Sequence, residues 1–252
     1  MNNNPYVFTQ KEIEKLPNSF YSHAEAIFHL TEVGIDVKQA RVADWLGVSR
    51  ANVSQVIGRM QNSGLIEMQE ELKLSEKGIY LAKMIARRHR IVERFLSEIL
   101  DLPWEQVYTE TKKWENVLSS VTEEAMLKVL GYPKTGLFGN PIPYSSYFEG
   151  PMSRLIDVEG NSNKKYSIVK ISEELKRDSS IISFLQKNKI LPGNQINIYD
   201  ANEYSITVSV AKDQFFGLDQ YIAERVFVSS VSYTHLRAHE TEADLVCRLL
   251  LE

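Results

Sequence analysis

Residues 37–74 read VKQARVADWLGVSRANVSQVIGRMQNSGLIEMQEELKL, and this stretch decides the fold. Apolar residues recur at helical spacing over Val37–Leu46, and Gly47 stands where a left-handed cap would end that helix. Ser49 is a suitable N-cap for a helix over Arg50–Asn62, whose apolar positions form one stripe and leave the opposite face polar. Two short runs follow in which apolar and polar residues alternate, and they predict a β-hairpin. We expect a helix-turn-helix followed by a wing.

This order of elements is typical of winged helix-turn-helix proteins, which place their second helix in the major groove of DNA. On the polar side of that helix, short side chains can reach base edges and an arginine can reach a phosphate. The candidate DNA contacts are Ser49, Arg50, Ala51, Asn52, Ser54, Gln55 and Arg59. The same side chains could be plain surface, and a winged scaffold that docks a protein partner without binding an operator is the alternative function.

The distribution of charge favours a nucleic-acid partner, although the 252-residue chain has a formal net charge of −4. Between Lys38 and Arg94, eleven lysines and arginines stand against six acids, so that segment carries +5 and the remainder −9. The basic segment can therefore bind the phosphates of DNA, whereas the acidic remainder of the chain repels them. No apolar run reaches the ~20 residues of a membrane helix and no signal sequence opens the chain, so we expect a cytoplasmic protein. The single cysteine, Cys247, excludes an intramolecular disulfide and a zinc cluster of CxxC type.

Helical patterns flank the winged segment on both sides. One helix is expected over Tyr21–Thr31, a long one over Ser75–Leu100, and another from about Pro103 to Leu130. Their apolar residues exceed what a small winged domain can cover, so we expect a two-fold dimer interface. The stretch 131–150 is rich in Pro, Gly, Tyr and Ser, which is typical of a linker.

The last part of the chain has the alternation of β-strands. Strands are expected over Ser167–Ile171, Gln195–Tyr199, Ser205–Val210 and Val226–Val228, with one short helix near Ile181–Lys187. Four or five such strands close naturally into a small antiparallel barrel. No Walker loop, GxSxG or HExxH motif is present, so we expect no enzyme.

The chain resembles the diphtheria-toxin-repressor family of metal-dependent bacterial regulators over roughly residues 20–228. The resemblance rests on Ala40–Ala43 with Leu46, Val53–Gln55, Arg59–Met60, Gly64–Leu65, Gly78, Arg88–Arg90, Glu93–Arg94, Trp114–Glu115 and the unusual Phe138–Pro143. It implies an α+β fold with a winged helix-turn-helix domain over 1–75, a helical dimerisation and metal-sensing domain over 76–150, and a C-terminal SH3-like small β-barrel over 151–229. It also implies a homodimer that controls metal-homeostasis genes when Fe(II) or Mn is bound.

The chain departs from the family at the implied metal site. Of the implied ligand positions on the first helix and on the helix that carries Trp114, two hold carboxylates, and the others hold Ser22, Lys112 and Asn116. The family also has a second, ancillary metal site, and there His89 and Glu93 match the implied ligands while Tyr108 replaces a third. Asp178 and Ile181 align loosely with ligands that the family's C-terminal domain provides. The surviving candidate metal ligands are Glu25, His89, Glu93 and Glu115.

Lys112 is more informative than a lost ligand, because its positive charge repels a divalent cation. The hypothesis is that Lys112 pairs with Glu115 or Glu25, so that the helices reach their DNA-competent packing without a metal or with weaker metal dependence. The alternative is that the four surviving residues still gather a weaker Mn or Fe(II) site. His23 and His29 have no partners that the sequence identifies, and structural roles are expected for them.

Residues 230–252 lie beyond the expected end of the barrel. His235 and His239 are spaced i, i+4 with Cys247 nearby, which alone would indicate a weak zinc site. The string resembles a translated sequencing adapter, however, and we expect this tail to be an artefact. Sequencing the genomic end of the gene distinguishes the two.

Overall fold

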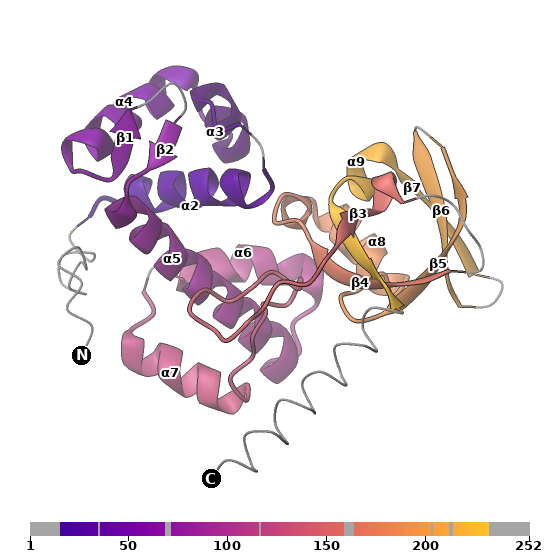
Figure 1. The fold of residues 1–252 in the computed structure, drawn as a ribbon. Helices are drawn as coiled ribbons and strands as arrows, with labels where there is room; N and C mark the ends of the chain where they lie inside the picture. The colour runs from indigo at the N-terminus through magenta and orange to yellow at the C-terminus, as the bar shows by residue number, and fades with distance from the viewer. Residues whose placement is uncertain are drawn as a thin grey trace, which may run out of the picture. The chain divides into compact units, whose positions relative to one another are not determined.

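The computed structural model describes residues 16–34, 36–68, 72–115, 117–158, 164–202, 204–211 and 214–231 (Figure 1). The expected artefactual tail falls, from residue 232 onward, outside these residues. Within them, no helix is both long and apolar enough to cross a membrane.

The chain forms two compact units. The first contains the described residues up to Leu96 together with Thr109–Pro133 and Ile142–Ser145, and the second contains Ser97–Tyr108, Lys134–Pro141 and the described residues from Ser146 onward. The three domain boundaries expected from the sequence stay a prediction.

The first unit begins with a three-helix core and a hairpin. Its elements are α2 (Asn18–Glu32), α3 (Gln39–Leu46), α4 (Arg50–Asn62), β1 (Ile66–Met68), β2 (Leu72–Leu74) and α5 (Glu76–Arg94). Gly47 ends α3 in the left-handed conformation with φ 66°, and the Ser49 hydroxyl caps α4 by accepting a bond from the Asn52 amide. β1 and β2 pair antiparallel with Ile66 opposite Leu74, which is the expected wing.

Two helix boundaries in this unit differ from the expected ones. α2 begins at Asn18, three residues before the expected Tyr21, because Pro17 is extended and allows the helix to start directly after it. α3 begins at Gln39 and not at Val37, because Lys38 has an extended backbone with φ −109° and ψ 149°. Val37 is nevertheless buried. It is apolar because it packs in the core, although it does not belong to the helix.

The expected single helix over Pro103–Leu130 is wrong. α5 runs into a short π-helix, Phe95–Ile99, and is followed by two separate helices, α6 (Trp104–Trp114) and α7 (Ser120–Val129). The Ser119 hydroxyl accepts a bond from the Thr122 amide at 3.2 Å and so begins α7 anew. Leu118 is buried between the two helices in sequence, which is why the apolar pattern continues across the break.

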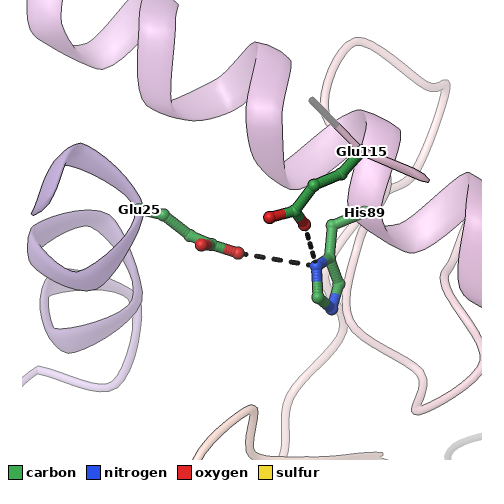
Figure 2. Close-up of side chains that lie close together, drawn as sticks. All are labelled: Glu25, His89 and Glu115. Carbon is green, nitrogen blue, oxygen red and sulfur yellow. Dashed lines mark hydrogen bonds and ion pairs between the residues drawn. The ribbon is translucent and has the colours of Figure 1, made fainter. Parts of the chain in front are cut away.

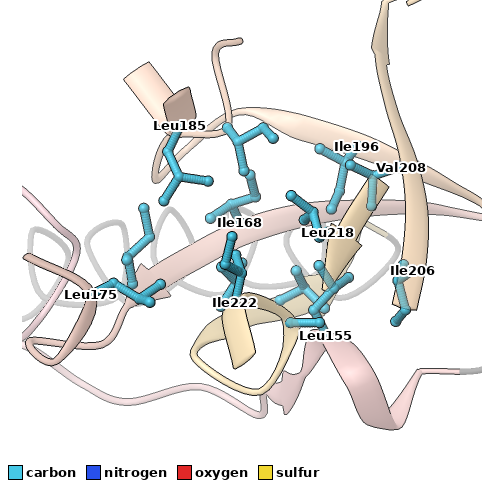
Figure 3. Packing of buried hydrophobic residues seen from close by; sticks show 14 of the residues in the cluster. Leu155, Ile168, Leu175, Leu185, Ile196, Ile206, Val208, Leu218 and Ile222 are labelled. Atoms are coloured by element: carbon cyan, nitrogen blue, oxygen red, sulfur yellow. The ribbon is translucent and has the colours of Figure 1, made fainter. Parts of the chain in front are cut away.

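The second unit contains a six-stranded antiparallel sheet in the order β3-β8-β4-β5-β6-β7. The strands are β3 (Ser153–Arg154), β4 (Lys165–Ile171), β5 (Gln195–Ala201), β6 (Ser205–Ala211), β7 (Gln214–Asp219) and β8 (Val226–Ser230), with helices α8 (Ser179–Lys187) and α9 (Gln220–Ala223). Register shifts in the β4–β8, β5–β6 and β6–β7 pairs bend the strands around a core that includes Ile168, Leu185 and Leu218 (Figure 3). The expected strands are present, and β3 and β7 are additional to them.

The segment expected to be a linker is packed at its centre, within the second unit. Phe138 is 1% exposed, and its carbonyl accepts a bond from the Ile171 amide at 2.8 Å. The Asn140 side-chain amide donates to the Ile171 carbonyl at 2.9 Å. Gly139 has φ 82°, and a Cβ added there would lie 2.1 Å from the Val169 carbonyl oxygen. Its backbone therefore needs both the left-handed conformation and the missing side chain.

Gly139→Ala should lower the free energy of unfolding by about 3 kcal/mol or more, because backbone strain and a backbone clash add at this position. Gly131→Ala is the matched control, since Gly131 also has a positive φ of 71° but no atom within 4 Å of an added Cβ. That control should cost only about 1 kcal/mol. Urea denaturation of both variants measures the difference, and equal losses would contradict the close approach to β4.

Candidate functional site

The exposed face of α4 carries every DNA contact expected from the sequence. The exposed residues are Ser49, Arg50, Ala51, Asn52, Ser54, Gln55 and Arg59, whereas Val53, Val56, Ile57 and Met60 are buried in the core of the first unit. The helical period therefore separates a polar outer face from an apolar inner face, as the sequence indicated. The outer face begins at the N-terminus of α4, where helices of this kind contact bases.

Arg59 is held at the side of this face by α2. Its guanidinium donates to the Ser19 hydroxyl at 3.2 Å and lies 5.3 Å from the centre of the Phe20 ring. These contacts fix a long, exposed side chain while leaving most of its five donors for other partners. An arginine presented in this way can bind a DNA phosphate.

A second cluster lies inside the first unit, where α2, α5 and the end of α6 meet. Figure 2 shows the carboxylates of Glu25 and Glu115 directed at the same ring nitrogen of His89. His89 Nδ1 lies 2.5 Å from Glu115 Oε2 and 3.6 Å from Glu25 Oε1. His89 Nε2 lies 3.0 Å from Glu93 Oε1, one helical turn along α5. These four residues, the expected metal ligands, are all buried and together.

Lys112 belongs to the same cluster. Its Nζ lies 2.5 Å from Glu25 Oε2 and 3.1 Å from Glu115 Oε1, so it contacts both carboxylates named in the hypothesis of ion pairing. The lysine side chain is 33% exposed, whereas the two carboxylate side chains are 8% and 5% exposed. We call Glu25, His89, Glu93, Lys112 and Glu115 the ion-pair cluster. It joins α2, α5 and α6 through charge.

The protonation states of the buried residues in the cluster are determined by the charges of their neighbours. Burial alone lowers the pKa of His89, but the negative charges of Glu93 and Glu115 outweigh it and raise that pKa from 6.5 to about 9. Burial alone raises the pKa of Glu25, but the positive charge of Lys112 outweighs it and holds that pKa well below its ordinary value. At neutral pH the cluster therefore contains a protonated imidazole, a lysine ammonium and a charged Glu25 carboxylate.

Glu25, His89 and Glu115 bring their ligand atoms within 4.8 Å of one another, as a metal site requires, but the charges around them oppose a divalent ion. Carboxylates and an imidazole are suitable ligands for Mn²⁺ or Fe²⁺. A ligating imidazole must have a nitrogen without a proton, however, and both nitrogens of His89 face carboxylates in the protonated form. The ammonium of Lys112 also lies against both Glu25 and Glu115, where a cation would have to bind. A metal could enter only after the lysine moved and His89 lost a proton.

The other residues aligned with family ligands have different neighbours. Asp178 caps α8 by accepting bonds from the amides of Ser180 and Ile181, and the Ile181 side chain has no ligand atom. The Ser22 hydroxyl donates to a backbone carbonyl one turn earlier in α2. Tyr108 belongs to the second unit, and Asn116 lies outside the described residues.

The charged neighbours of His29 were not expected from the sequence. His29 Nε2 lies 3.6 Å from Glu25 Oε1, and Nδ1 lies 3.3 Å from Glu32 Oε2. Glu32 in turn pairs with the buried Arg90 at 2.6 Å. The spacing of four residues between Glu25 and His29 on α2 was the available signal. These pairs extend the charged network from the cluster along α2.

The cluster makes stability depend on pH, with a sign that follows from His89. A pKa raised above 6.5 stabilises the fold fully below that pH, and this stabilisation is lost as the pH rises toward about 9. The free energy of unfolding should therefore fall by up to about 3 kcal/mol between pH 6.5 and 9. Urea denaturation across this range measures the slope. His89→Gln should remove most of it, and an unchanged slope in that variant would assign the effect to another group.

Comparisons with known proteins identify relatives of this chain. Residues 75–144 match the family model described as "Iron dependent repressor, metal binding and dimerisation domain". The iron-dependent repressor IdeR of Mycobacterium tuberculosis is 30% identical over 230 residues, covering 87% of this chain and all of that protein. The diphtheria toxin repressor of Corynebacterium diphtheriae is 32% identical over 196 residues, covering 74% of this chain and 86% of that protein. Both relatives are named as repressors.

A solved structure of a manganese-dependent transcriptional repressor in complex with manganese shares the fold. It has a TM-score of 0.74 and 22% sequence identity, and the match covers 84% of this chain and 99% of the other. The likeness confirms the expected α+β class, and the six-stranded C-terminal sheet is consistent with an SH3-like domain. Because its sequence matches the whole of IdeR at 30% identity, the chain belongs to the family of iron-dependent and diphtheria toxin repressors, which are transcriptional regulators.

Proposed function

We propose that this protein is a cytoplasmic homodimer that binds a double-stranded DNA operator and controls metal-homeostasis genes. The observation that carries the proposal is the outer face of α4, where six polar or small residues are exposed beside Arg59, which α2 holds in place. We retain the sequence-based domain division, with the winged domain ending near residue 75, the helical domain near 150 and the SH3-like domain near 229. The family membership supports regulation and not catalysis.

We further propose that Lys112 takes the role that a metal ion has in metal-dependent relatives. A bound cation would hold α2, α5 and α6 together through Glu25, Glu115 and a deprotonated His89. Here the lysine ammonium attracts both glutamates, and the protonated His89 attracts Glu115 and Glu93. The same helices are thereby held by charges that belong to the chain itself. Operator binding should then need neither Mn²⁺ nor Fe²⁺.

The homodimer is supported by an exposed apolar stripe on α7. Val117, in the connection before α7, is 80% exposed. On α7 itself Val121 and Val129 are 79% and 60% exposed, and the exposed Ala125 completes their spacing of four residues. Residues four apart lie on one face of a helix, so these side chains form a continuous strip. The strip lies within the segment that matches the dimerisation domain model. A second copy of the chain is therefore its proposed occupant.

Base reading by α4 can be tested with two variants of base-contacting residues and one variant of a phosphate-contacting residue. Gln55→Ala should reduce discrimination between the operator and unrelated DNA by about 1–3 kcal/mol, and Arg50→Ala should act in the same way. Arg59→Ala should weaken binding to all sequences and reduce its salt dependence, because Arg59 is assigned to a phosphate. Fluorescence anisotropy with an operator selected from random duplexes measures both effects.

Gln61→Ala is the matched control for Gln55, since Gln61 is an exposed glutamine at the opposite end of α4. It should leave discrimination unchanged. An equal loss on operator and unrelated DNA for Gln55→Ala would refute base reading. Failure of the wild-type chain to select any sequence would favour the protein-docking scaffold.

A further inference from the structure

We propose that the first unit binds a small amphipathic monoanion, a medium-chain carboxylate, in a pocket behind the wing. The pocket has a volume of about 520 Å³ and lies among the C-terminal part of α2, the connection to α3, strand β2 and the start of α5. Cavities of this size hold ligands of ordinary small-molecule dimensions. The ion-pair cluster contributes no residue to it.

The walls of this pocket are largely apolar. Phe28 comes from α2, Val37 from the connection, Leu72 and Leu74 from the wing, and Ile79 from α5. Ile79 is 39% exposed, although it lies in the first turn of a helix whose other apolar residues are mostly buried. A hydrocarbon body placed against these walls would remove them from water, which favours binding in proportion to the area covered.

The charged residues of the lining indicate that the ligand has a charged group in addition to its apolar part. Among the lining residues that the structure describes, Lys73 and Lys83 stand with one acid, Asp36, so this part of the lining has a net positive charge. A single carboxylate can form a charge-assisted hydrogen bond with a lysine while its chain follows the apolar walls. Two lysines disfavour a metal cation, and an uncharged hydrocarbon would gain nothing from them. The combination fits a monoanion with an apolar body.

The position of the pocket connects it to the wing. The Leu72 amide donates to the Val37 carbonyl at 3.3 Å, and both residues line the pocket. A bound carboxylate would therefore contact both Leu72 and Val37, the two residues whose hydrogen bond connects the wing to the helix-turn-helix. Any resulting effect on operator affinity rests on the proposed function, whereas binding of the carboxylate does not.

Calorimetric titration of the full chain with sodium octanoate tests the site. We expect saturable binding of one octanoate per chain and at least tenfold weaker binding of 1-octanol, which lacks the charge. Lys73→Ala combined with Lys83→Ala should weaken octanoate at least tenfold and leave 1-octanol unchanged. Ile79→Glu should abolish octanoate binding by placing a negative charge in the pocket. Lys128→Ala, an exposed lysine on α7, is the control and should change nothing.

Ile79→Trp serves as a second blocking variant, because it fills the pocket without adding charge. Octanoate binding that does not saturate, or that survives both Ile79 variants, would overturn the proposal. If wild-type protein binds no octanoate and Ile79→Glu lowers its oligomeric mass, a second copy covers the pocket and the carboxylate site is refuted. No DNA is present in these titrations, so their failure is separate from any failure of operator binding.

Discussion

Lys112→Glu should make operator binding depend on a divalent metal. The substitution replaces the ammonium that contacts Glu25 and Glu115 with a further carboxylate, so several negative charges then meet around His89. Without metal, their repulsion should separate α2 from α6 and weaken operator binding. With Mn²⁺ or Fe²⁺ present, carboxylates and a deprotonated imidazole form a suitable ligand set. We expect added metal to raise operator affinity by about 10–100-fold, the usual range for coupling between two sites.

Lys113→Glu is the matched control. Lys113 is the next residue on α6, is 62% exposed and pairs with Glu110, three residues earlier on the same helix, at 2.6 Å. Its substitution should leave operator binding independent of metal. Lys112→Met tests the lysine without supplying a ligand, and it should lower the free energy of unfolding by about 1–3 kcal/mol with no recovery in Mn²⁺. Metal dependence in the Lys113 variant, or none in Lys112→Glu, would count against the assigned role of Lys112.

Val121→Glu should dissociate the dimer. Val121 lies in the first turn of α7 and belongs to its exposed apolar stripe, so a second copy would bury the new carboxylate against apolar side chains without a partner. Such burial costs about 3 kcal/mol or more, which raises the dimer dissociation constant at least ~100-fold. Sedimentation velocity at micromolar concentration should show a dimer for wild-type protein and a monomer for the variant. Operator affinity should fall as well, because paired half-sites are read by dimers.

Val48→Glu controls for the addition of an exposed charge, since Val48 is 39% exposed and lies in the turn before α4. Its sedimentation should match that of the wild type. A monomeric wild-type protein, or a dimer that survives Val121→Glu, would show that the stripe is not the interface.

The helix-turn-helix could be predicted from the sequence because its signals are local. Gly47 marks a left-handed cap, Ser49 caps the next helix, and the helical period separates the two faces of α4. Each signal acts within about one turn, so no knowledge of tertiary contacts is needed. The α6–α7 break was missed because the buried Leu118 keeps the apolar pattern across it, and only Ser119 marked the new helix.

Strand β7 was missed for a related reason. Phe215 and Phe216 are adjacent aromatic residues, and Gly217 follows, so the sequence does not alternate there. Its pairing with β6 places it in the sheet regardless. Tertiary pairing thus overrides a weak local pattern.

The ion-pair cluster needed information from distant parts of the chain. His89 and Glu93 are one turn apart and could be paired from spacing, whereas Glu25, His89 and Lys112 are separated by more than twenty residues in each interval. Only the family resemblance placed them in one site, and it did not include His29. The carboxylates of Glu93 and Glu115 then keep His89 protonated against the opposing effect of burial, and no sequence pattern reports that balance.

The operator affinity of the wild-type chain with and without metal tests the central claim most directly. An operator selected from random duplexes would be titrated by fluorescence anisotropy once in a chelator and once in excess Mn²⁺, with Fe²⁺ under anaerobic conditions as a parallel sample. If Lys112 and protonated His89 hold the helices together, the dissociation constants should agree within about twofold. Affinity that appears only with metal, with a ratio of tenfold or more, would contradict the account.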